Sequence, residues 1–160
     1  MAVDMFFKIG TIKGESKADK HVGEIDVLAW SWGMSNSGTA HMGGGAGAGK
    51  VSMQDISFTK YIDNSTNELC LCCASGDHIG EALLTVRKAG KEQQEYLKIK
   101  LEDVFVSSYS TGGSGGEDRL TENITLNFAK VLLEYSEQKE DGSLAAAKPF
   151  SWDIPAGKKA

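Results

Sequence analysis

The sequence predicts an all-β domain with one short helix, on the basis of three observations. Several segments alternate apolar and polar residues with a period of two, which is typical of strands that bury one face. Glycine is abundant, with 19 among 160 residues, whereas proline occurs only twice. Only one segment begins with the residues of a helix start. Seven or more strands with one helix indicate a barrel or a sandwich.

The length and charge of the chain set the class of protein. Residues 1–160 are expected to form a single domain, because about 100 to 200 residues is the usual size of one. The net charge is −5, and no block of lysine or arginine is present, which argues against a nucleic-acid partner. No apolar run approaches the roughly 20 residues of a membrane-spanning helix. The first residues lack the pattern of a Sec-type export signal, so we expect folding in the cytoplasm without a signal peptide.

The first two strands are expected at Met5–Ile12 and Val22–Met34. The second of these is apolar on both faces, with Trp30 and Trp32 as its largest side chains, so it should lie between two layers or beneath a partner. A further strand is expected at Val51–Tyr61.

One helix is predicted near residues 64–75. The spacing of Ser65 and Glu68 matches a capping box, and Gly76 is a suitable stop. The three cysteines of this helix are crowded and odd in number, which favours free thiols packed in the core over disulfides or a metal site. They are Cys70, Cys72 and Cys73.

The second half of the chain continues the strand pattern. Strands are expected at Ala82–Arg87 and Glu95–Ser108, and then along Arg119–Tyr135, where the apolar face changes parity near Phe128–Ala129. Such a change indicates a bulge or a bend at a barrel corner. Pro149–Ile154 should be a final edge strand, because an edge position tolerates proline.

Two short motifs resemble catalytic loops but lack their context. Gly44–Lys50 matches the letters of a phosphate-binding loop, yet Val51 replaces the Ser or Thr that holds Mg²⁺, and a strand pattern follows. Gly112–Gly116 matches a nucleophile elbow around Ser114, but a strand again follows where a helix is needed. We therefore expect no catalytic residue, no cofactor and no metal.

The histidines offer Ser114 no evident partner. His21 and His41 lie in loop-like stretches and are expected to be solvated, and nothing in the sequence pairs His78 with the serine.

The most unusual segment is the glycine-rich stretch Ser35–Gly49. A loop of this length is rare in a compact domain unless it is functional or disordered. Strand-like segments flank it, so we expect it to project from the end of a hairpin, where glycine permits close approach to a neighbouring chain. We interpret it as an interface.

The chain also resembles the haemolysin-coregulated protein (Hcp) family, the tube subunit of bacterial type VI secretion systems. The resemblance covers essentially the whole chain and is carried by MAVDMFFKIG with IKGES, EIDVLAWSWGMSNSGTAHMGGGAGAGK, QDISFTKYIDNST, LTVRKAG and SSYSTGGSGGEDRLTENITLNFAKV. The resemblance implies a compact β-barrel of two packed sheets, which forms homohexameric rings that stack into a tube. It also implies sheath and spike proteins as partners, small effector proteins carried and stabilised in the lumen, and expulsion into target cells by the apparatus.

In this reading, the long loop corresponds to the family segment that contacts the next ring. The residues of this ring-stacking interface are Ser35, Thr39, His41, Met42, Gly43, Gly44, Gly45, Gly47 and Gly49. Ser31 shares strand parity with Ala29 and Gly33, opposite the two tryptophans, and is the candidate for lining the lumen and contacting an effector. The alternatives are a monomeric ligand-binding β-barrel and, less favoured, a secreted hydrolase.

Overall fold

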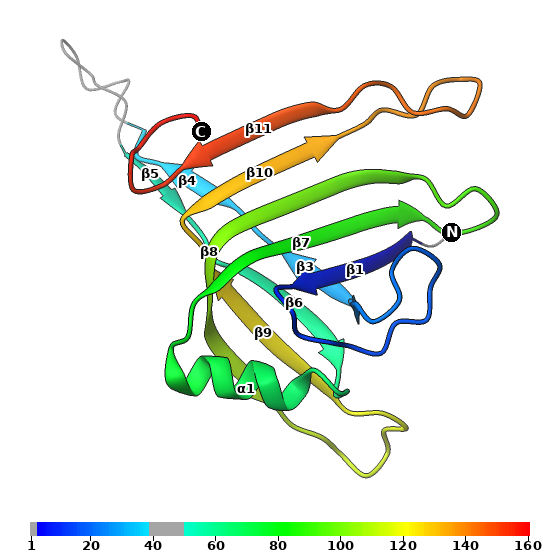
Figure 1. Cartoon of the computed structure of the whole chain (residues 1–160), viewed down its shortest axis with the longest axis vertical. Coiled ribbons are helices and arrows are strands. Elements are labelled where there is room, and N and C mark those ends of the chain that lie inside the picture. Colours follow the sequence, from blue (N-terminus) through cyan, green and yellow to red (C-terminus); the bar gives the residue numbers. More distant parts are fainter. Residues whose placement is uncertain (1–2, 39–49) are drawn as a thin grey trace.

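The computed structural model describes residues 3–38 and 50–160. It is mainly β with one helix, as predicted (Figure 1). In chain order the elements are β1 Val3–Ile9, β2 Ile25–Asp26, β3 Ala29–Ser31, β4 Met34–Asn36, β5 Val51–Met53, β6 Ile56–Tyr61, α1 Thr66–Ser75, β7 Ile79–Lys88, β8 Glu95–Thr111, β9 Thr121–Asn127, β10 Lys130–Tyr135 and β11 Lys148–Asp153.

Two sheets share the long strand β8. Its first half pairs with β7 and β10, and its second half pairs with β9. Between the halves, Asp103 has a φ of 52°, a conformation that breaks the extended path. The first sheet therefore has the order β2-β1-β7-β8-β10-β11, and the second has the order β8-β9-β6-β3.

The expected closed barrel is not formed. Among the described strands, β2 and β3 remain as edges of one continuous sheet. The segment between β2 and β3, Val27–Leu28, crosses from β1 to β6. The Val27 amide donates to the Met5 carbonyl, and the Leu28 amide donates to the Thr59 carbonyl. Because consecutive amides bond to different strands, this crossing holds the edges together without forming a ladder.

Two of the expected strands are also divided. Val22–Met34 contains β2, β3 and the start of β4, since the chain passes from the first sheet to the second and then leaves both. Val51–Tyr61 is interrupted at Asp55, whose carboxylate accepts hydrogen bonds from Ser107 Oγ at 2.8 Å and from Asn127 Nδ2 at 2.9 Å. Those bonds fix the chain at the corner where β8 bends.

The corner predicted at Phe128–Ala129 is confirmed. Strand β9 of the second sheet ends just before it, and β10 of the first sheet begins just after it. Phe128 is buried, and the Ala129 amide donates to the Glu102 carbonyl at 3.0 Å. Among the described strands, β11 has β10 as its one partner, with Pro149 opposite Glu134, so the predicted edge strand is confirmed as well.

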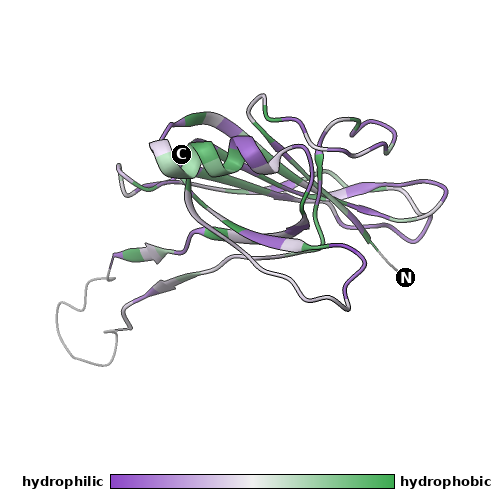
Figure 2. Ribbon diagram, turned by 90° about the horizontal axis from the view of Figure 1, so that it is seen from below, coloured by the Kyte–Doolittle hydropathy of each residue, from purple (hydrophilic) through white to green (hydrophobic). Residues whose placement is uncertain are grey.

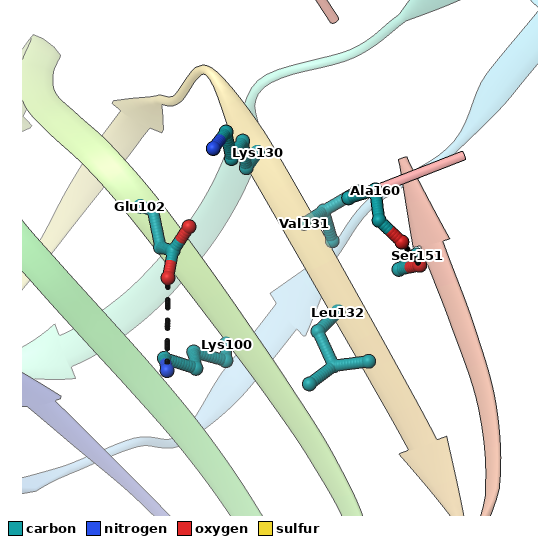
Figure 3. Close-up of a pocket in the computed structure, with 7 residues that line it drawn as sticks. All are labelled: Lys100, Glu102, Lys130, Val131, Leu132, Ser151 and Ala160. Carbon is teal, nitrogen blue, oxygen red and sulfur yellow. Dashed lines mark hydrogen bonds and ion pairs between the residues drawn. The ribbon is translucent and has the colours of Figure 1, made fainter. Parts of the chain in front are cut away.

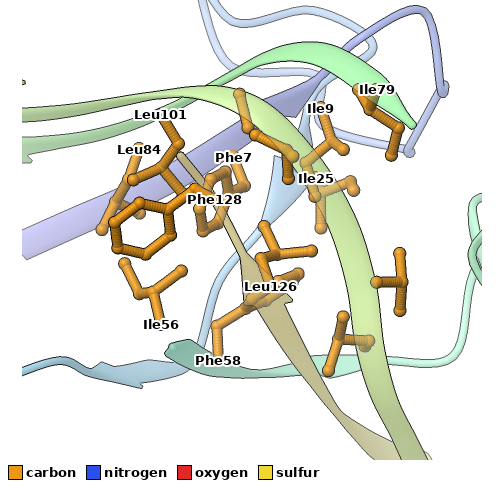
Figure 4. Close-up of a cluster of buried hydrophobic side chains, with 14 of the residues drawn as sticks. Phe7, Ile9, Ile25, Ile56, Phe58, Ile79, Leu84, Leu101, Leu126 and Phe128 are labelled. Carbon is orange, nitrogen blue, oxygen red and sulfur yellow. The ribbon is translucent and has the colours of Figure 1, made fainter. Parts of the chain in front are cut away.

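The core lies between the two sheets, where alternate residues of the strands meet (Figure 4). Its largest side chains come from both sheets, and Phe7 of β1 contacts Phe58 of β6 with ring centroids 4.8 Å apart. The buried set includes Phe7, Ile9, Ile25, Ile56, Phe58, Leu84, Ile99, Leu101, Ile124 and Leu126.

Helix α1 packs against β8 and begins at Thr66. The predicted capping box is absent: Ser65 makes no side-chain cap bond, and its Oγ donates instead to Asp63 Oδ1 at 2.5 Å. At the other end Gly76 has a φ of 72° and its amide donates to the Cys72 carbonyl, which terminates the helix as predicted. In residues 3–38 and 50–160, no helix is long and apolar enough to cross a membrane.

The three cysteines are free, but they are half-buried rather than enclosed in the core. Cys72 and Cys73 pack against the edge of the core, and Leu69 is the fully buried residue of the helix. Burial raises the pKa of the Cys72 thiol, and the charges of Asp77 and Glu68 raise it further.

A buried ion pair fastens the start of α1 to the second sheet. Lys60 Nζ donates to Glu122 Oε2 at 2.5 Å and to Asp63 Oδ1 at 2.8 Å, and the side chains of Lys60 and Glu122 are fully buried. Thr66 Oγ1 and Tyr109 Oη also donate to Glu122, at 3.0 and 2.7 Å. Burial and the hydrogen bond to Glu122 raise the pKa of the Tyr109 phenol. This network joins β6, β8, β9 and the first turn of α1.

Replacing Lys60 with Met should lower the free energy of unfolding by about 3–5 kcal/mol, because it leaves the Glu122 carboxylate buried without its counter-ion. Replacing Glu122 with Leu in the same chain should recover most of that loss, since no charge is then left unpaired. Urea denaturation measures both. Lys98→Met, at an exposed position, is the control, and a Lys60→Met loss no greater than that of the control contradicts the assignment.

Candidate assembly surfaces

The most prominent feature of the surface is a two-stranded arm, made of β4 and β5. The two strands pair with each other in a sheet of their own, with Ser35 opposite Ser52. They extend away from the packed strands in Figures 1 and 2. The arm lies beyond the end of β3 and of the second sheet. It is therefore placed to contact a partner outside its own chain.

The root of the arm is firmly attached. The Gln54 amide donates to the Gly33 carbonyl at 3.0 Å, and Met53 packs against the core. A Cβ added at Gly33 would lie 3.2 Å from Gln54 Oε1. The segments that lead into β4 and out of β5 therefore approach each other closely at this point. Met34, by contrast, is exposed. The arm thus combines a fixed root with an accessible surface.

One of the predicted ring-stacking residues, Ser35, lies in this arm. The expectation that the loop begins at Ser35 is wrong, because Ser35 and Asn36 extend the strand by pairing with Ser52 and Val51. Ser35 is exposed in β4. The other residues lie outside the described part of the chain: Thr39, His41, Met42, Gly43, Gly44, Gly45, Gly47 and Gly49.

A second surface is the outer face of the second sheet, which contains Ser31. Ser31 is exposed on the edge strand β3, while Trp30 and Trp32 pack against the core, so the predicted parity is confirmed. The outward residues of β6 and β9 continue the same surface, which we call the hydroxyl face. Its members are Ala29, Ser31, Ser57, Thr59, Asn123 and Thr125.

The hydroxyl face carries uncharged hydrogen-bonding groups of small size. Ser57 Oγ lies 3.1 Å from Thr125 Oγ1, and Thr59 Oγ1 donates to Asn123 Oδ1 at 2.7 Å. A shallow hollow of about 220 Å³ opens among Ser31, Ser57 and Asn123. Sequence reasoning identified only Ser31, although the period-two alternation of β6 and β9 was a signal that could have found the others.

The outer face of the first sheet has a different character, because it carries charged side chains such as Lys100, Glu102 and Lys130 (Figure 3). Lys100 Nζ lies 3.7 Å from Glu102 and 3.8 Å from Glu81. A pocket of about 240 Å³ opens beside these residues, with Leu132 and Ser151 among its lining. The two outer faces of one molecule therefore present unlike chemistry to a partner.

The motifs that resemble catalytic loops do not gather into a site within the described residues. Ser114 lies in an exposed loop before β9, and Lys50 leads into a strand, as expected. The prediction that His21 is solvated is wrong: its ring is buried, with Nε2 2.7 Å from Glu95 Oε1. His78 is exposed beside the ring of Phe105.

Comparison with known proteins explains the arrangement. The sequence profile of the family described as "Type VI secretion system effector, Hcp" matches residues 6–135. The chain is also 64% identical over 156 residues to Protein hcp1 of Pseudomonas aeruginosa, covering 96% of each protein. The chain belongs to the Hcp family.

Solved structures agree with this assignment. Hcp1 from Salmonella typhimurium is 39% identical and superposes with a TM-score of 0.82 over all of both chains. A structure described as a type six secretion system protein is 29% identical, with a TM-score of 0.93 over 99% of this chain and 100% of its own. The mainly-β fold is therefore the fold of Hcp proteins.

Shortening the arm should leave the folded body intact. Replacing residues 36–51 by Asn-Gly joins Ser35 to Ser52 through a two-residue hairpin turn. Because the described residues that are removed, 36–38 and 50–51, are exposed or half-buried, the free energy of unfolding should change by less than about 1 kcal/mol in urea denaturation. Phe58→Ala, which empties part of the core, should cost about 3–5 kcal/mol and is the comparison. A loss of that size in the shortened chain shows that the arm supports the core.

Proposed function

We propose that this Hcp protein is a structural subunit of a type VI secretion tube, in which homohexameric rings stack and the arm bridges one ring to the next. The observation that carries the proposal is the arm itself, which has a fixed root and an accessible surface beyond the end of the second sheet. Membership of the Hcp family supplies the tube context.

The edges of the sheets support lateral contact between copies. Strands β3 and β11 each pair on one side only within the described chain, so backbone donors and acceptors remain on their other sides. A ring uses such heterologous contacts when the rotation between neighbours closes. The charged outer face of the first sheet and the hydroxyl face then have different partners.

The lumen is assigned to the hydroxyl face around Ser31. Small, uncharged hydrogen-bonding groups leave room for a protein cargo and allow weak, reversible contacts. Small effector proteins are the cargo of this proposal. The charged outer face is left for the sheath, since charged surfaces dock reversibly and depend on salt.

Such a subunit remains in the cytoplasm until the apparatus fires. It is then expelled with the spike into the target cell, by the apparatus rather than by a signal peptide. The role is mechanical and needs no catalytic residue. A ligand-binding barrel is less well supported, because hydrophobic side chains from both sheets fill the space between them.

Native mass spectrometry at high protein concentration should show a species of six times 17.1 kDa. The ring forms by association of separate chains, so its population should rise with concentration. A monomer alone, at every concentration tested, would falsify the tube proposal.

The chain with residues 36–51 replaced by Asn-Gly should still form this six-fold species but should not form stacks. The same outcome is expected when only Gly43–Gly49 is deleted. Electron microscopy and light scattering of the wild-type and shortened chains measure the stacks. Stacks of normal length in the shortened chains would show that the arm does not bridge rings.

Ser31→Arg should reduce cargo retention by about tenfold or more, because a long charged side chain would leave polar groups of the cargo interface unpaired. The readout is the amount of small protein that copurifies with the ring after expression in a bacterium with a type VI system. Ser151→Arg, on the charged outer face of the first sheet, is the matched control. Equal retention by the two variants contradicts the lumen assignment.

A further inference from the structure

The segment Lys13–Glu24 covers part of the outer face of the first sheet. Phe6 and Arg87 belong to the strand faces that point away from the main core, yet they are only 3% and 2% exposed. The ring of His21 stacks on Phe6, with centroids 4.4 Å apart and planes 7° apart. The Arg87 Nη1 donates to the Asp19 carbonyl at 2.9 Å. The segment therefore forms a small second core, separate from the one between the sheets.

Internal hydrogen bonds give this segment its own shape. The Gly14 amide donates to the Gly23 carbonyl, and the Gly23 amide donates to the Ser16 carbonyl, both at 2.8 Å. The Ser16 amide donates to the backbone carbonyl of Glu24 at 3.0 Å. These bonds brace the segment internally, and the side chains of His21 and Arg87 join it to the sheet. Glu15 Oε2 also accepts a hydrogen bond from the Asn64 amide at 2.7 Å.

His21 makes the direct side-chain contact between this segment and β8. Its Nε2 lies 2.7 Å from Glu95 Oε1, a residue 74 positions away, and its Nδ1 lies 3.0 Å from Glu24 Oε2. The Nδ1 contact lacks the alignment of a hydrogen bond, and it is an attraction between charges when the ring is protonated. A protonated ring satisfies both carboxylates. A neutral ring that donates from Nε2 turns its Nδ1 lone pair toward the Glu24 carboxylate.

Other charged groups near the ring act in both directions. Lys98 lies 3.4 Å from Glu95 and shares that carboxylate with His21. The Arg87 guanidinium lies over Phe6, 4.9 Å from its centroid, and opposes a second positive charge. Asp4, 3.6 Å from Arg87 Nε, offsets part of that opposition. The two carboxylates are the charged groups that lie nearest to the ring.

We propose that Lys13–Glu24 is a pH-responsive clamp, which protonated His21 holds closed on β1, β7 and β8 and which loosens when the ring loses its proton. The device depends on contacts within one chain, so it is independent of tube assembly. Loosening would expose Phe6 and Arg87 and displace Val22, which is 75% exposed on the segment. The clamp thus changes the surface that the protein offers to its partners.

The Glu95 carboxyl determines how far the pH can fall before the clamp loosens. Burial alone would raise the pKa of its carboxyl, but the hydrogen bond and charge of His21, with Lys98, outweigh burial and lower it. A carboxyl whose pKa is lower in the folded chain adds stability above its unfolded value, and this contribution is lost as the pH falls through the folded value. Loss of the Glu95 charge at low pH therefore also loosens the clamp.

Hydrogen exchange of the full-length protein tests the clamp. The amides of Gly14, Ser16, Gly23 and Glu24 should lose at least about tenfold in protection factor between pH 6 and pH 8.5, while β7 and β8 amides keep theirs. His21→Phe keeps the aromatic stack but has no ring proton, so its protection should not change with pH. His78→Phe is the matched control and should behave like the wild type.

Glu95→Gln keeps a hydrogen-bond acceptor but removes one charge, so the pH at which protection is lost should move downward. Equal wild-type protection at pH 6 and pH 8.5 overturns the proposal, as does an unchanged pH dependence in His21→Phe. An unchanged midpoint in Glu95→Gln removes Glu95 as the controlling partner. Ring formation is measured separately on the same samples, so failure of the clamp and failure of the tube proposal give different results.

Discussion

Strand β8 supports the hydrogen-bond ladders of both sheets, and the rest of the architecture depends on its bend. Its first residues pair with β7 and β10, and from Phe105 onward it pairs with β9; the left-handed conformation at Asp103 lies close to this change. An extended strand that changes sheets must reorient its side chains at one point. That point brings Val104 and Val106 into the core and directs the second sheet across the first.

The buried ion pair of Lys60 and Glu122 joins the second sheet to the start of α1. Removing its two charges from water costs free energy. Two full charges out of water are tolerated because Asp63, Thr66 and Tyr109 satisfy their remaining hydrogen-bonding groups. An apolar pair could pack as well, but it would not specify where α1 begins. The network therefore contributes to the uniqueness of the helix position, in place of the capping box that the helix lacks.

The two outer faces of the molecule follow from the alternation of inward and outward side chains along each strand. Residues that face inward from β6 and β9 build the core, so the residues between them must face outward, where they form the hydroxyl face. The first sheet follows the same rule but exposes lysine and glutamate, except where Lys13–Glu24 covers it. One molecule thus has an uncharged face, a charged face and a projecting arm.

Residues close together in the chain set the mainly-β class, the corner at Phe128–Ala129, the helix stop at Gly76 and the parity of Ser31, so the sequence predicts each of these. Contacts between distant segments set the open sheet, the division of Val22–Met34, the strand pairing of Ser35 and the burial of His21. A period of two tells which residues share a face but not which strand lies beside them. Neither the hydrogen bond from His21 to Glu95 nor the crossing at Val27–Leu28 could be read from the sequence, because both join segments distant in the chain.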